Sequence, residues 1–272
     1  MKQTVYLRED LQAAWQQQDC FDVLIKQQGD VFRDKEGRRT LRFTLNNHSY
    51  FLKYHAGVGW GEIVKNLLQW RLPIISAKNE WQAIERLHQL GIATMQLAAY
   101  GERGNNPAKR HSFVVTDDLA NTMSLEDLGK QWQQIKPTFK TKKTLIEKLA
   151  DISRTMHQAG INHRDYYLCH FLLTDTFADS NEINQDTVLH LIDLHRAQQR
   201  NKVPQRWLIK DLGSLYFSAH DVPLTLRDRL RFMKRYSNKS LRDTIEQDAT
   251  FWHEVEQRAQ VLLEKWQRHT PK

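Results

Sequence analysis

The apolar residues of this 272-residue chain follow two patterns, and the change from one to the other most constrains the fold. Up to about residue 118, short runs of aromatic and branched residues alternate with turn signals, which is typical of antiparallel strands. From there on, apolar residues recur mainly at helical spacing. Strands followed by helices predict the α+β class. We therefore expect a small N-terminal sheet lobe with one helix at residues 1–118 and a larger, mainly helical lobe at residues 119–272, which together form one functional unit.

The first part predicts an antiparallel meander over residues 29–54, because its apolar runs are interrupted by the turn signals Lys35-Glu36-Gly37 and Asn46-Asn47. The elements expected next are a glycine-containing loop, a capped helix and a strand, at residues 57–62, 79–91 and 111–116.

The second part predicts a buried helix at residues 142–159, where every third or fourth residue on one face is apolar. Two short apolar runs at residues 171–173 and 188–192 are each bounded by polar turn residues, which is typical of a small hairpin. From Leu208 onward the pattern is helical again.

Lysine and arginine outnumber aspartate and glutamate by 40 to 32, which gives a net charge of +8. Such a charge attracts anionic partners, such as a nucleotide, an acidic protein, a nucleic acid or an anionic membrane leaflet. The basic residues are dispersed among acidic ones rather than interleaved with aromatic residues in one stripe, so we do not expect nucleic-acid binding.

No apolar stretch has the length of a signal-peptide core or the roughly 18 residues of a membrane span. We therefore expect a cytoplasmic protein whose contact with a membrane, if it has one, is peripheral. Cys20 and Cys169 are isolated and lack a C-x-x-C partner, so the sequence predicts reduced thiols rather than a disulfide or a thiolate zinc site.

The tripeptide His163-Arg164-Asp165 lies between the expected buried helix and the first hairpin strand. It resembles the catalytic loop of protein kinases, in which the Asp accepts the proton of the attacking hydroxyl and a residue five positions later, normally Asn, binds magnesium. That later position is His170 in this chain. A neutral imidazole can bind a metal, although Mg²⁺ prefers oxygen ligands. For His157, His163 and His170 together, structural or loop-bracing roles are favoured over a zinc site, since no carboxylate or thiolate completes a tetrahedral set.

Asp193 lies 28 residues beyond Asp165, at the end of the second hairpin strand. Protein kinases place the D-F-G aspartate that holds magnesium at this point of the chain. Leu194 and His195 replace the Phe and Gly of that motif, so the charge for the metal is kept whereas the usual activation-segment switch is not.

Lys53 ends an apolar strand, where kinases have the lysine that pairs with ATP phosphates, and Glu80 near the start of the next helix is its expected ion-pair partner. The order of lysine strand, glutamate helix, strand, helix, H-R-D, hairpin and aspartate is far more specific than any one of its members. The G-x-G-x-x-G loop of kinases is absent between the first two expected strands, where only Gly29 and Gly37 occur. Arg38 and Arg39 near that turn are at least as well explained as surface residues.

Two further features have alternative interpretations. The glycine-rich stretch at residues 57–62 is either a contact with nucleotide or acceptor, or a flexible turn. Asp211 either braces the catalytic loop from a following helix or is an ordinary carboxylate at a helix start.

Several longer segments carry a narrower resemblance, at residues 57–63, 65–68, 79–84, 162–166, 169–173 and 192–197. They resemble the lipopolysaccharide core heptose kinases of Gram-negative bacteria, a family with the protein-kinase-like bilobal fold, over nearly the whole chain. In that family His170 and Leu194-His195 look like normal features, and the lack of G-x-G-x-x-G is expected.

The resemblance implies a role for each matching residue. Asp165 would activate a heptose hydroxyl, Asp193 would hold Mg²⁺ with support from His170, Lys53 would contact the phosphates of ATP, and Glu80 would position Lys53. Phosphoryl transfer needs alignment and neutralisation of charge more than covalent chemistry, and these groups supply both.

The implied acceptor is the inner core of lipopolysaccharide, an anionic glycolipid at the cytoplasmic face of the inner membrane. Docking on that anionic leaflet would use a basic run of five residues: Arg227, Arg229, Arg231, Lys234 and Arg235. The alternative is a solvated helix face. An acidic protein partner is a further expectation from the net charge.

Three rival functions remain from the sequence. A protein-tyrosine or protein-serine kinase could use the same core and modify its own Tyr54, Tyr166 or Tyr167, but no A-P-E follows Asp193. A catalytically silent nucleotide-binding or lipid-binding protein of this fold is opposed by the retained charged residues. Nucleic-acid binding is the remotest.

Overall fold

The computed structural model describes residues 3–35, 37–68, 75–174 and 183–269. Its internal contacts divide the chain into two units. The first contains residues 1–86, 95–120 and 194–196, and the second contains residues 87–94, 121–193 and 197–272.

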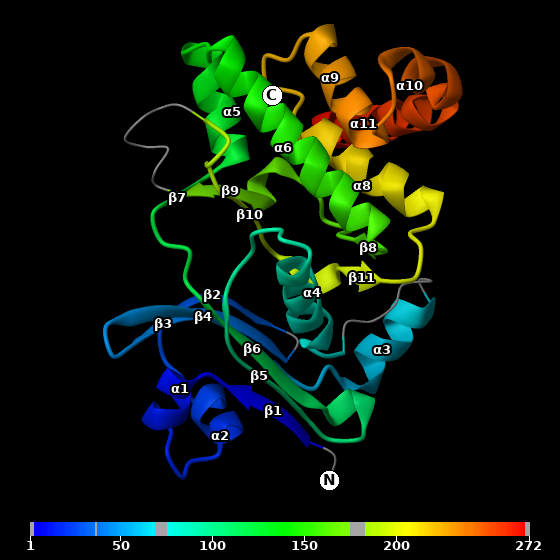
Figure 1. Ribbon diagram of the computed structural model, residues 1–272. Helices are drawn as coiled ribbons and strands as arrows, with labels where there is room; N and C mark the ends of the chain where they lie inside the picture. The colour runs from blue at the N-terminus through cyan, green and yellow to red at the C-terminus, as the bar shows by residue number, and fades with distance from the viewer. Residues whose placement is uncertain (1–2, 36, 69–74, 175–182, 270–272) are drawn as a thin grey trace. The chain divides into compact units, whose positions relative to one another are not determined.

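The first unit is built on a six-stranded antiparallel sheet (Figure 1). Its strands, in spatial order, are β1 (Gln3–Leu7), β5 (Leu97–Arg103), β6 (His111–Asp117), β4 (His48–Ala56), β3 (Arg38–Leu45) and β2 (Asp30–Lys35). Asn46 and Asn47 join β3 to β4 with φ of 51° and 61°, as a two-residue hairpin turn requires. The predicted meander is therefore confirmed, although Glu36 of its first turn lies outside the described residues.

One face of this sheet is covered by two short helices, α1 (Glu9–Ala14) and α2 (Cys20–Ile25), to which the sequence analysis assigned no element (Figure 1). Phe21 of α2 meets Phe113 of β6 edge-to-face with ring centroids 4.9 Å apart. Cys20 is buried in the same core, and this burial raises the pKa of its thiol. Cys20 and Cys169 are both free.

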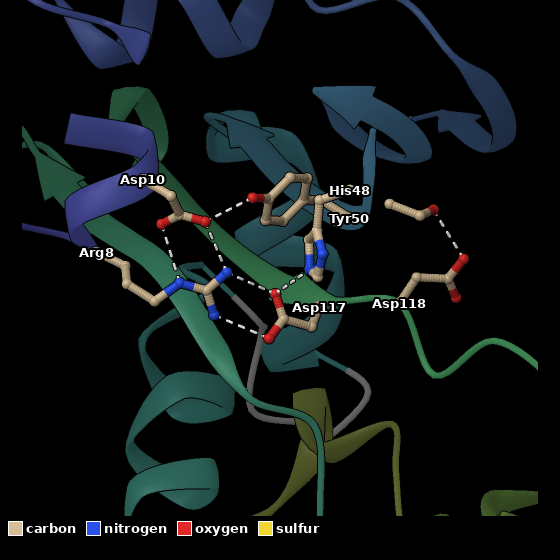
Figure 2. Close-up of polar contacts among 7 residues, drawn as sticks. Arg8, Asp10, His48, Tyr50, Asp117 and Asp118 are labelled. Atoms are coloured by element: carbon tan, nitrogen blue, oxygen red, sulfur yellow. Dashed lines mark hydrogen bonds and ion pairs between the residues drawn. The ribbon is translucent and has the colours of Figure 1, made fainter. Parts of the chain in front are cut away.

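Arg8, between β1 and α1, ties this N-terminal segment to the sheet (Figure 2). Its guanidinium donates to Asp10 and to Asp117 at 2.8–2.9 Å, and the Tyr50 hydroxyl also donates to Asp10. His48 contacts the same carboxylate of Asp117 at 2.9 Å. We call these five residues the Arg8 network. In this network the guanidinium of Arg8 is paired with two carboxylates, those of Asp10 and Asp117.

The glycine-rich stretch is not the loop that its composition predicted. Only Gly57 and Val58 precede α3 (Gly59–Leu68), which begins at the second glycine. Val58 and Ile63 pack with Ala108 in a small apolar cluster, so tertiary packing outweighs the low helix propensity of glycine. The next helix is α4 (Lys78–Gln89), close to the predicted range.

The second unit contains two small sheets and a group of helices (Figure 1). One sheet has the order β10 (Leu189–Leu191), β9 (Phe171–Thr174) and β7 (Thr122–Ser124), and the other pairs β11 (Gln198–Gln199) with β8 (Ile161–Asn162). The antiparallel pairing of β9 with β10 confirms the predicted hairpin.

The described helices of the second unit are α5 (Leu125–Gln134), α6 (Phe139–Gln158), α8 (Gln205–Ser218), α9 (Leu226–Ser237), α10 (Leu241–Gln247) and α11 (Ala249–His269). Asp228 fixes the start of α9 through a capping box with Thr225 and an ion pair of 2.7 Å with Lys142 of α6. Burial would raise the pKa of Asp228, but its hydrogen bonds to Lys142 and Thr225 outweigh that effect and lower the pKa to about 2. No described helix is long and apolar enough to cross a membrane.

A cavity of about 670 Å³ lies among these helices. Apolar side chains form most of its wall, including Leu128, Trp132, Leu149, Leu212, Phe232 and Trp252. Every residue that lines it belongs to the second unit.

Candidate active site

Lys53 and Glu80 form the charged pair of the first unit. Lys53 lies on β4, and Glu80 lies in the first turn of α4. The Nζ atom of Lys53 is 2.7 Å from Oε1 of Glu80, whose side chain is 2 % exposed. Within the described chain, the other oxygen of Glu80 is buried without a hydrogen-bond partner. A buried carboxylate is costly to leave uncompensated, so Glu80 depends on the ammonium of Lys53.

His55 lies two residues beyond Lys53 on β4, and its pKa is sensitive to the charges around Lys53. Its pKa is lowered to about 3, mainly by burial and then by the charges of Arg38 and Lys53. The imidazole is therefore neutral at physiological pH. A region where positive charges prevail is suited to an anion such as a nucleotide phosphate.

The tripeptide with Asp165 occupies the loop between β8 and the 3₁₀ turn at Leu168–His170. Arg164 has φ of 76°, and Asp193 has φ of 60°. A non-glycine residue with positive φ costs on the order of 1–3 kcal/mol and persists only where its surroundings impose it. Both predicted catalytic segments of the second unit thus contain a strained residue.

Asp211 braces this loop. Its carboxylate, fully buried in α8, accepts the backbone N–H groups of His163 at 2.6 Å and Arg164 at 2.8 Å. The Nε2 atom of His157 is 3.4 Å from the same carboxylate. Because Asp211 lies well inside α8 rather than at its start, the first of the two interpretations given by the sequence is the correct one.

The ring of His163 connects the two aspartate segments. Its Nδ1 accepts the backbone N–H of Asp165 at 3.3 Å, so its Nε2 carries the hydrogen and donates to the carbonyl of Ile192 at 2.9 Å. Burial, the main cause, lowers the pKa of His163 and keeps the ring neutral, as both bonds require. One buried histidine thus orients the backbone of Asp165 and the carbonyl that precedes Asp193, as expected of a loop-bracing residue.

His170 and Asp193 face each other. The Nδ1 of His170 donates to the carbonyl of Asp165 at 2.6 Å, which leaves the lone pair of a neutral ring on Nε2. That Nε2 is 3.7 Å from Oδ2 of Asp193. Two lone-pair atoms this close together repel each other unless a cation or a proton lies between them. The pair formed by His170 and Asp193 therefore fits a metal ion.

The described side chains here do not supply the four protein ligands of a structural zinc site. No cluster of three or more His, Cys, Asp or Glu side chains able to hold a metal occurs in the part of the chain that the structure describes. Mg²⁺ is commonly held by one or two protein ligands together with substrate phosphates and water, whereas a structural zinc site needs four protein ligands. Burial and then the charge of Glu126 raise the pKa of Cys169 to about 11.

The predicted site residues therefore fall into two groups. Lys53 and Glu80 belong to the first unit and contact each other, whereas Asp165, His170 and Asp193 belong to the second and share one backbone network. The part that Ile192 plays in this network could not be predicted, because a backbone carbonyl leaves no signal in a sequence.

The comparison with protein families decides the assignment. The model of the lipopolysaccharide kinase (Kdo/WaaP) family matches residues 22–236. The chain belongs to this family. The lipopolysaccharide core heptose(I) kinase WaaP from Pseudomonas aeruginosa is 47% identical to this chain, over 97% of this chain and 97% of the relative. The protein of the same name from Escherichia coli is 45% identical, over 96% of this chain and 97% of the relative.

A solved structure, described as WaaP in complex with acyl carrier protein, superimposes with a TM-score of 0.81. It is 41% identical to this chain and covers 95% of it, with 99% of its own chain matched. The predicted α+β kinase-like fold class is confirmed, as is the family that the sequence segments indicated.

Proposed function

We propose that this chain is an ATP-dependent kinase that phosphorylates a heptose hydroxyl of the lipopolysaccharide inner core. The single observation that carries the proposal is the network in which His163, His170 and Asp211 hold the loop of Asp165 and the segment of Asp193. Its membership of the lipopolysaccharide kinase family and the names of its relatives agree with it.

In this mechanism Asp165 is the general base that accepts the proton of the heptose hydroxyl. Lys53 binds the phosphates of ATP, and Glu80 holds the ammonium of Lys53 in position. Asp193 and His170 would hold Mg²⁺, which neutralises charge on the transferring phosphoryl group when it is bound. Asp211 holds the backbone of Arg164, and His163 holds the N–H of Asp165 and the carbonyl before Asp193, so the two aspartates are oriented before substrate binds.

The decisive experiment measures transfer of labelled phosphate from ATP with magnesium to inner-core lipopolysaccharide that lacks phosphate. Asp165→Asn should lower kcat at least about 100-fold, the usual contribution of a general base. Asp186→Asn, which alters an exposed carboxylate of the same unit, is the matched control and should retain activity. A folded Asp165→Asn protein that transfers phosphate at the normal rate would contradict the proposal.

The rival functions are outcomes of the same experiment. Label on protein tyrosine alone would indicate a protein kinase, although Tyr54 and Tyr166 are 2 % and 0 % exposed and so are poor targets. ATP binding without transfer to any acceptor would indicate a silent nucleotide-binding protein.

We also propose that the chain binds an acyl carrier protein, the expected acidic partner. The related WaaP structure contains this partner, and the net charge of +8 favours an acidic protein. Because carrier proteins present an acyl group, the apolar cavity of the second unit offers that group a place.

The length of the acyl chain tests this second proposal without any substitution. Each buried methylene contributes about 0.8 kcal/mol, so two further carbons should tighten binding roughly tenfold until the cavity is filled. The measurement is calorimetric titration with carrier protein bearing acyl chains of increasing length, and unacylated carrier is the control. Equal affinity for acylated and unacylated carrier would contradict use of the cavity.

We further propose peripheral docking on the anionic cytoplasmic leaflet of the inner membrane, where the acceptor lies. The basic run of α9 is less available for this than its sequence indicated. Arg229 contacts Glu256, Arg231 pairs with Asp228, and Arg235 pairs with Asp151.

Arg227 and Lys234 are exposed on α9, and none of the described carboxylates pairs with either of them. Replacing both by Glu should reduce cosedimentation with vesicles that contain anionic lipid, with neutral vesicles as the control. Unchanged sedimentation would exclude α9 as the docking face.

A further inference from the structure

Trp207, in the first turn of α8, lies among four cationic side chains. The distances from the charged group to the centroid of the indole ring are 4.4 Å for Lys210, 5.1 Å for Arg164, 5.7 Å for Arg206 and 5.8 Å for Arg200. A fifth cation, Arg258 of α11, contributes to the electrostatic environment of Lys210. We call these six residues the Trp207 cluster, and all of them belong to the second unit.

Four of the five cations in the Trp207 cluster have no acidic partner in the part of the chain that the structure describes. Among the described residues, no carboxylate lies within ion-pair distance of Arg200, Arg206, Lys210 or Arg258. Partial loss of hydration, followed by the charges of Arg258, Arg206 and Arg164, lowers the pKa of Lys210, although its side chain is exposed. Burial and Arg206 likewise lower the pKa of Arg200. Gathering like charges in this way is unfavourable until an anion joins them.

Two donors of the cluster also lack acceptors. The Nε1 of Trp207 and the Nε of Arg258 are buried and make no hydrogen bond within the described chain. A buried donor without an acceptor costs about 1–3 kcal/mol. Among the described residues, the guanidinium of Arg200 bonds only to neutral oxygens, those of the Asn162 and Gln198 side chains.

The cluster is connected to the catalytic loop by the backbone. Arg164 immediately precedes Asp165, and its N–H is held by Asp211, one residue after Lys210 on α8. A group bound by the cluster is therefore positioned by the same helix that braces the loop of Asp165.

We propose that the Trp207 cluster binds oxyanions of the glycolipid acceptor, either carboxylates or phosphates. Arginine side chains bind both groups through paired N–H donors, which makes several arginines together suited to a multiply anionic sugar. This site rests on the proposed function and adds to it a binding region for the acceptor, separate from the groups that contact ATP.

The test is steady-state kinetics of the double variant Arg206→Gln/Lys210→Gln, in which both altered side chains are exposed. Loss of two charge-assisted contacts should raise the KM for inner-core glycolipid about tenfold and leave the KM for ATP within about twofold of wild type. The matched control, Lys265→Gln/Arg268→Gln, removes the same charges from the exposed last turns of α11 and should change neither constant.

Two kinetic outcomes would overturn the inference. An equal rise in the acceptor KM for the control pair would show general attraction by net charge rather than a site. A rise in the KM for ATP with an unchanged acceptor KM would assign the cluster to the nucleotide. Two modified acceptors identify the bound group: one with its carboxylates reduced and one with its phosphates removed. The bound group is the one whose loss abolishes the difference in acceptor KM between wild type and variant.

Direct binding separates this inference from the proposed function. In the Asp165→Asn background, binding of the same glycolipid should weaken about tenfold when Arg206 and Lys210 are replaced. Wild-type protein that binds glycolipid through these residues but transfers no phosphate would refute the proposed function and leave the site standing. Wild-type transfer with unchanged binding and kinetics in the variant would refute the site alone.

Discussion

The Arg8 network of the first unit and the Trp207 cluster of the second both place cations near an aromatic ring, yet their charge balance is opposite. Arg8 lies 5.9 Å from the Tyr50 ring and has two carboxylates of its own (Figure 2). Trp207 has four cations around it, and for Arg206 and Lys210 the described chain supplies no carboxylate. A network whose cations have carboxylate partners stabilises the packing of the elements that it joins. A cluster of cations without such partners is suited to binding an anionic ligand.

The largest effect is expected from removing Arg8. Arg8→Ala leaves Asp10 and Asp117 without their guanidinium, so the free energy of unfolding should fall by about 2 kcal/mol in a urea titration. The control is Arg42→Ala, whose pair with Asp30 is exposed on both sides and should therefore contribute far less to stability. Equal losses would show that the Arg8 network is no more than a surface ion pair.

Acid should remove the contribution of the Arg8 network. The hydrogen bond from Arg8 is the main cause that lowers the pKa of Asp10, while at Asp117 burial is outweighed by bonds from Arg8 and His48. A carboxyl whose folded pKa is lowered stabilises the fold above its unfolded pKa, and this stability is lost as pH falls through the folded value.

The difference in unfolding free energy between wild type and Arg8→Ala should therefore be constant from pH 7 to about pH 5 and shrink below about pH 4. Urea titrations across this range measure it. A difference that stays the same at pH 3 would mean that Arg8 stabilises the fold through packing rather than charge.

The smallest effect is expected at the Trp207 cluster, and its sign is opposite. Arg206→Gln/Lys210→Gln relieves repulsion, so the free energy of unfolding at low ionic strength should rise by about 0.5 kcal/mol. High salt should abolish the gain. A loss of stability would mean that acidic groups balance these cations after all, and the contrast with the Arg8 network would fail.

Local signals predicted much of the fold and of the site. The Asn46-Asn47 turn, the hairpin of β9 and β10, and the helices α4 and α6 depend on neighbouring residues, and all were predictable. The ion pair of Lys53 with Glu80 followed from strand and helix order. The roles of Asp165, His170 and Asp193 stay predictions that the transfer experiment tests.

Other features depended on residues far apart in the chain. The α3 helix forms in spite of two glycines because Val58 and Ile63 pack on Ala108. The basic run on α9 looked available in the sequence, but its partners Asp151 and Glu256 lie on other helices.

The sequence by itself determined the types of the main elements and the identity of the charged residues in the kinase motifs. Spacing and turn chemistry act over a few residues, so they can be read without the fold. Only the tertiary structure decided which charges are neutralised: Arg8 by Asp117, and Arg206 and Lys210 by no described carboxylate. Electrostatic energy depends on distance in space and on burial, and a sequence specifies neither.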